Sequence, residues 1–86
     1  MARSTESQFA DAVESILRDR PNGEASIAEL IDEIPNRMTL TADDLVQSPT
    51  RPNEPLWHQS VRNITSHLAT HQGRFVSIPG GLALAA

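Results

Sequence analysis

The chain of 86 residues is long enough for one small domain with a single core and too short for large internal sites. It has no cysteine, which excludes disulfides, thiolate metal sites and cysteine nucleophiles. The formal net charge of −4 argues against a generic nucleic-acid binder. We find no leader peptide and no apolar run of membrane length, so we expect a cytoplasmic protein with no membrane partner.

The first part of the chain predicts two helices joined by a short strand. Residues 5–8 match a capping box, and the apolar stripe behind them predicts a helix over residues 6–20. We interpret Glu24–Ser26 as a minimal strand. Residues 26–29 form a second capping box, and the helix that they open ends at Pro35.

The middle of the chain predicts a short helix and then a loop. Thr41 is the expected cap of a short helix that begins over residues 41–44, with Leu40, Leu45 and Val46 as the side chains that anchor it to the core. Residues 47–55 contain three prolines and are interpreted as a loop. Asn53 is the expected N-cap of the helix that follows.

The longest predicted helix spans about residues 55–72 and stops at Gly73. Strands at residues 75–78 and 82–84 should follow and form a hairpin around a turn at residues 79–81. The helix has an apolar stripe that we expect to pack on the first two helices. The stripe consists of Trp57, Val61, Ile64 and Leu68, and its expected partners are Phe9, Val13, Leu17, Leu30 and Ile34.

The opposite face of this helix has one charge, no carboxylate and several side chains that suit base edges. Arginine can pair with guanine, asparagine and glutamine with adenine, and serine with either. We therefore expect Gln59, Arg62, Asn63 and Ser66 to face DNA bases. Ordinary solvated polar residues remain the competing interpretation of this face.

Charge is divided unevenly along the chain. Residues 1–45 contain ten acids and four arginines, for a net −6, whereas residues 46–86 contain one acid and three arginines, for a net +2. An anionic partner would approach the second part. There we expect Arg51, His58 and Arg74 to meet phosphate or the groove edge.

Three main helices, an extra short helix before the third and a C-terminal two-stranded wing predict a mainly α fold with a small β-hairpin, the winged helix-turn-helix. GEASIAELIDEI, LTADDL and SPTRPNEPLWHQSVRNITSHL, followed by a short hairpin, resemble the N-terminal winged-helix domain of Mrr-type restriction endonucleases. The resemblance covers about residues 9–84.

The resemblance implies binding of double-stranded DNA, often modified, and delivery of a separate nuclease domain in the same or a partner chain. The family often has a more basic third helix, and its (D/E)-x-Lys nuclease core cannot exist in a chain without lysine. We therefore expect a non-catalytic module with no cofactor, either monomeric or a homodimer. The alternatives are a protein-interaction or dimerisation module and a small stand-alone transcriptional regulator.

Two other patterns favour simpler interpretations. His67 and His71 are four residues apart, a spacing that can bind a metal, but no third ligand is evident, so we expect no metal site. The C-terminal LALAA resembles the end of a bacterial degradation tag, and we favour a final strand instead.

No catalytic residue is expected, because neither Ser60 nor Ser66 has a general base beside it.

Overall fold

Capping boxes start the first two helices of the computed structural model, which describes residues 3–85. Helix α1 (Glu6–Arg18) begins where the Thr5 hydroxyl accepts a hydrogen bond from the Gln8 N–H at 3.2 Å and the Gln8 side chain accepts from the Thr5 N–H at 2.7 Å. Ser26 and Glu29 make the same reciprocal pair at the start of α2 (Ile27–Glu33). Both predicted helix starts are confirmed.

Both helices end in 3₁₀ geometry. Helix α1 stops two residues earlier than predicted, because the N–H groups of Asp19 and Arg20 donate to carbonyls three residues back at 3.1 Å. Helix α2 passes into a 3₁₀ turn, η1 (Ile34–Asn36), which accommodates Pro35. The predicted strand between the helices is present as β1 (Glu24–Ser26).

The predicted short helix over residues 41–46 is wrong. Asp44 and Thr41 exchange cap-type hydrogen bonds, with Thr41 N–H to the Asp44 carboxylate at 2.9 Å and Asp44 N–H to the Thr41 hydroxyl at 3.2 Å. The segment forms turns and does not continue into a helix. Leu45 and Val46 are 56% and 53% exposed, so they do not anchor it to the core.

Helix α3 (Trp57–Ser66) starts without a side-chain cap. Asn53 is not its N-cap and instead adopts a left-handed conformation in the preceding loop. The N–H groups of Leu56 and Trp57 donate to the carbonyls of Val46 (2.7 Å) and Asp44 (3.1 Å). The turns over residues 41–46 thus take the place of an N-cap.

The long predicted helix is shorter than expected, because the chain leaves helical geometry at His67 (φ −120°, ψ 37°). A 3₁₀ segment, η2 (Leu68–His71), follows. Gln72 and Gly73 both have positive φ, so the predicted stop at Gly73 closes η2 and not α3.

The C-terminal hairpin joins β1 in a three-stranded antiparallel sheet with the order β1-β3-β2. Strand β2 (Phe75–Ile78) pairs with β3 (Gly81–Leu84), and β3 pairs with β1 so that Gly81 faces Ser26. A Cβ atom at Gly81 would lie 2.0 Å from the Ala25 carbonyl oxygen. Only glycine therefore permits this register, and Gly81 belongs to the strand and not to the turn.

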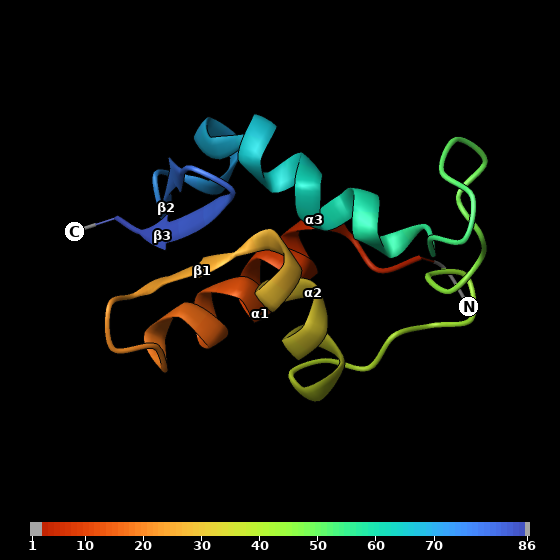
Figure 1. The fold of residues 1–86 in the computed structure, drawn as a ribbon, viewed down its shortest axis with the longest axis horizontal. Helices are drawn as coiled ribbons and strands as arrows, with labels where there is room; N and C mark the ends of the chain where they lie inside the picture. Colours follow the sequence, from red (N-terminus) through yellow and green to blue (C-terminus); the bar gives the residue numbers. More distant parts are fainter. Residues whose placement is uncertain (1–2, 86) are drawn as a thin grey trace.

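The core lies where α3 crosses α1 and α2 beside the sheet (Figure 1). Trp57, Val61 and Ile64 are buried and Leu68 is half-buried, and the predicted partners on the first two helices and η1 are all buried. The Trp57 and Phe9 rings stack with centroids 5.9 Å apart. The predicted packing of α3 is confirmed.

The molecule is thus a small α/β domain of three helices and a C-terminal hairpin that pairs with a third strand. This arrangement is compatible with a winged helix. The hairpin lies at the C-terminal end of α3, and the loop of residues 47–55 lies at its N-terminal end (Figure 1). Ala86, the end of the LALAA sequence, is outside the described residues.

Candidate functional site

Helix α3 has a polar side, which we call the α3 polar face: His58, Gln59, Arg62, Asn63 and Ser66. The first four side chains are half-buried and Ser66 is exposed. Because Trp57, Val61 and Ile64 bury the other side of the helix, this row of side chains points away from the core.

Hydrogen bonds connect the middle of the α3 polar face. The Gln59 amide donates to the Asn63 side-chain oxygen at 2.8 Å, and Arg62 Nη2 donates to the Gln59 oxygen at 3.4 Å. These bonds restrict the rotamers of all three side chains. The structure therefore brings together three of the residues predicted to face bases.

The helix itself has no carboxylate on this face, but the loop before it supplies one. Glu54, in the loop before α3, accepts a short hydrogen bond from Arg62 Nη2 and forms an ion pair with it. This bond from Arg62 lowers the pKa of Glu54. The helical pattern could not predict this pair, because Glu54 lies in the loop and only the folding of the loop brings it onto the helix.

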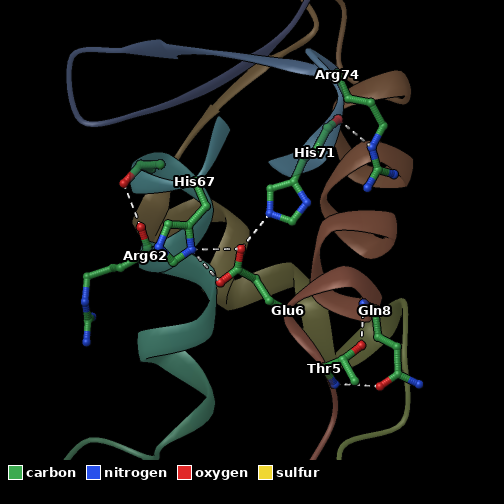
Figure 2. A network of polar contacts seen from close by, with 8 residues as sticks. Thr5, Glu6, Gln8, Arg62, His67, His71 and Arg74 are labelled. Atoms are coloured by element: carbon green, nitrogen blue, oxygen red, sulfur yellow. Dashed lines mark hydrogen bonds and ion pairs between the residues drawn. The ribbon is translucent and has the colours of Figure 1, made fainter. Parts of the chain in front are cut away.

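These contacts orient the Arg62 guanidinium, although not all of its N–H groups have hydrogen-bond partners. Its Nε atom is buried and has no hydrogen-bond partner among residues 3–85. The side chain is 26% exposed and extends from the side of α3 opposite the Glu6 carboxylate (Figure 2). Its Nη1 atom has no partner among these residues either and is not buried, so its donors are left for an acceptor outside the molecule.

His58 is the member of the α3 polar face nearest the start of the helix. Its ring contacts Trp57 edge-to-face with centroids 4.4 Å apart. Burial lowers the pKa of His58 below its ordinary value near 6.5, and the nearby Glu54 carboxylate partly opposes that shift. His58 is neutral at pH 7 and brings no positive charge to a phosphate there.

Arg74 lies away from the α3 polar face. Its guanidinium contacts Asp11 at 2.8 Å and Glu14 at 3.3 Å, both on α1, and lies over the Phe75 ring. The hydrogen bond to Asp11 raises the pKa of Arg74. Figure 2 shows Arg74 and Arg62 on opposite sides of the same region. The structure thus does not bring Arg74 together with the other predicted site residues.

Arg51 is at the exposed tip of the loop before α3. Backbone bonds close the neck of this loop, with Ser48 N–H donating to the Glu54 carbonyl at 2.8 Å. The Ser48 hydroxyl accepts from the N–H groups of Thr50 and Arg51 at 3.3 Å each. Arg51 makes no ion pair within the described part of the chain, so its charge is available to a partner.

A contact that sequence reasoning missed joins the start of α1 to the end of α3. Glu6 lies between two histidines, at 3.0 Å from His67 Nδ1 and 2.7 Å from His71 Nε2 (Figure 2). The spacing of the histidines was considered only as a possible metal pair, and Glu6 is more than sixty residues away from both in sequence. Among residues 3–85, no three His, Cys, Asp or Glu residues are arranged to hold a metal ion.

Two surface hollows lie elsewhere on the molecule. One, of about 360 Å³, is lined by α1 and by the segment after η1, including Arg37 and Met38. The other, of about 300 Å³, is lined by Glu6, His71 and Arg74 among others. Neither is lined by the α3 polar face.

Comparisons with protein-family models, with curated proteins and with solved structures find no match to this chain. In the part of the chain that the structure describes, no helix has both the length and the apolar character needed to cross a bilayer.

Proposed function

We propose that this chain is a winged-helix module that binds double-stranded DNA, with α3 as the helix that enters the major groove. The observation that carries the proposal is the row of Gln59, Arg62 and Asn63, held by mutual hydrogen bonds on the outward side of α3. Amide and guanidinium groups in such a row match the donors and acceptors of base edges in the major groove. Helices α1 and α2 support α3 from behind, as a recognition helix requires.

The charge distribution favours recognition through few phosphate contacts. Five of the seven arginines form ion pairs with acidic residues of the chain. Arg51 is the cation best placed beside α3 to meet a phosphate. Each neutralised phosphate contributes a slope of about −0.9 to the dependence of log K on log salt, so we expect a shallow salt dependence.

The wider role is that of a targeting module whose nuclease lies in a separate domain or partner chain. This part of the proposal depends on the resemblance to the Mrr-type winged-helix domain. In this role the module itself is not an enzyme, and modified cytosine is the first base modification to test. A homodimer would read two half-sites in one duplex.

A protein partner is the second candidate. Leu45 and Val46 are both more than half exposed and lie in the turns that precede α3. Adjacent exposed aliphatic side chains are more typical of a contact surface than of a DNA-facing one. Replacing both with serine should leave DNA affinity unchanged if they serve a separate protein contact.

Substitution of Arg62 tests the proposal. Arg62→Ala should weaken binding to a duplex selected by the protein from a random pool by about 1–3 kcal/mol, which is roughly 5- to 150-fold. Binding to a scrambled duplex should change much less, because base contacts and not phosphate contacts carry sequence information. Fluorescence anisotropy with labelled duplexes at low salt measures both affinities.

Arg18→Ala is the matched control, since Arg18 is an exposed arginine on α1 that is also ion-paired. It removes one positive charge without touching α3. If Arg62→Ala and Arg18→Ala have equal effects on the selected duplex, or if no duplex is enriched from the pool with or without modified cytosine, the proposed function is wrong.

A further inference from the structure

Glu54 is the one acidic residue in the second part of the chain, and it contacts the one charged side chain on the α3 polar face. An acid beside the arginine best placed to read DNA should weaken binding, because it repels phosphate. Glu54 therefore opposes simple electrostatic attraction of DNA to this face.

The Glu54–Arg62 pair is held in place from both sides. The Glu54 carbonyl accepts from the Ser48 N–H, which fixes the loop at this residue. Arg62 projects from the middle of a helix whose other side is buried, and Gln59 contacts the same Nη2 atom. The carboxylate and guanidinium side chains are only 21% and 26% exposed, so solvent screens their attraction less than it screens a fully exposed pair.

The pair leaves part of the guanidinium unused. Glu54 and Gln59 both bond to Nη2, and no residue in the described range bonds to Nη1. The two N–H groups of Nη1 are not used within the described residues, whereas Nε is buried. Arg62 can therefore donate from Nη1 to a base edge while Glu54 remains bonded to Nη2.

We propose that Glu54 is a specificity-determining residue that orients Arg62 toward base edges and suppresses its use as a general phosphate contact. This inference rests on the proposed DNA-binding function. Non-specific binding depends on the number of cations that displace counterions from the duplex, and a paired Arg62 contributes little to it. A hydrogen bond to a base is short-ranged and directional, so Glu54 weakens it less than it weakens a phosphate contact. The net effect is a larger ratio of specific to non-specific affinity.

The test is Glu54→Gln, which keeps the side-chain shape and removes the charge. We expect tighter binding to a labelled duplex of random sequence, with a salt slope steeper by about 0.9, the value for one additional phosphate contact. Affinity for the selected duplex should rise less, so that the specificity ratio falls. Glu24→Gln is the control, because Glu24 is an exposed acid on β1. A cooperative unfolding transition for each variant shows that the fold is retained.

The same substitution in the Arg62→Ala background separates this mechanism from a general charge effect. If Glu54 acts through Arg62, Glu54→Gln should give a smaller gain in that background than in the parent, because only the direct repulsion of phosphate by Glu54 is then removed and coupled residues are not additive. An equal gain with and without Arg62 overturns the inference.

The remaining outcomes separate this inference from the proposed function. If the parent binds duplexes and Glu54→Gln behaves like Glu24→Gln, the inference fails while the proposed function stands. If the parent binds no duplex but Glu54→Gln does, the suppression of phosphate contacts is supported and the proposed function of the parent fails. If neither binds any duplex, both fail.

Discussion

Asp44 is a buried carboxylate that ties three segments of the chain together. It is 1% exposed and accepts hydrogen bonds from the Ser4 N–H (2.7 Å), the Ser4 hydroxyl (2.6 Å) and the Thr41 N–H (2.9 Å). Its own carbonyl accepts from the Trp57 N–H at the start of α3. The position of the α3 polar face therefore depends on this residue.

Asp44→Asn should destabilise the fold by about 1.5–3 kcal/mol, the range for hydrogen bonds to a charged group. The asparagine side chain has only one acceptor oxygen, and its NH2 group cannot accept a hydrogen bond. At least one of the three donors is therefore left unpaired. Chemical denaturation measures the loss. The adjacent Asp43→Asn is the control, since Asp43 is exposed. Equal effects of the two variants would show that the carboxylate does not hold these segments.

Asp44 also predicts how stability depends on pH. Burial raises the pKa of Asp44, but the hydrogen bonds from Ser4 and Thr41 outweigh that effect and hold the pKa below its ordinary value near 3.8. A lowered pKa contributes stability that is fully present above the unfolded value and is lost as the pH falls through the folded value. The parent should therefore lose stability in acid more steeply than Asp44→Asn. Parallel acid denaturation profiles would contradict this.

At the scale of elements, α3 owes its position to one buried side. Ile64 is fully buried, whereas Leu68 lies beyond the helix in η2 and is half-buried. We expect Ile64→Ala to cost about 2–5 kcal/mol. Leu68→Ala should cost less, about 1 kcal/mol, because less apolar surface is exposed to water by the change. Chemical denaturation of the two variants compares them, and equal losses would mean that η2 packs as tightly as α3.

The elements that the sequence predicted well are those fixed by local patterns. Both capping boxes, the apolar stripe of α3 and the hairpin are present because each depends on residues close together in the chain. The strand before α2 is also present, but it forms by pairing with β3 near the C-terminus. The end of α3 was not predictable in this way. His67 and His71 both contact Glu6 at the other end of the sequence, at the place where the helix gives way to η2.

Long-range contacts also account for the errors at the candidate site. Asn53 is a residue type that often caps helices. Here α3 starts instead with backbone hydrogen bonds from its first N–H groups to the carbonyls of Val46 and Asp44. Leu45 and Val46 had the hydrophobicity of core residues, but the turns around Asp44 leave them outside. Arg74 was expected to meet phosphate or the groove edge, but it forms ion pairs with Asp11 and Glu14 on α1.

At the scale of the whole molecule, most of the acidic residues lie away from the face that we propose to bind DNA. Asp11 and Glu14 on α1 pair with Arg18 and with Arg74, which precedes β2, and Glu6 contacts two histidines. On the α3 polar face, Glu54 pairs with Arg62. A duplex approaching α3 meets mostly neutral hydrogen-bonding groups and the free charge of Arg51. Weak, direction-dependent binding is the expected consequence of such a surface.

An NMR titration of the ¹⁵N-labelled protein with the selected duplex at low salt tests the central claim most directly, because it reports which surface meets DNA. We predict that the largest changes in backbone and side-chain amide signals occur at Gln59, Arg62 and Asn63, with smaller changes around Arg51 and little change along the acidic side of α1. Changes centred on α1 or on Leu45 and Val46, or no changes at any duplex concentration, would contradict recognition of DNA through α3.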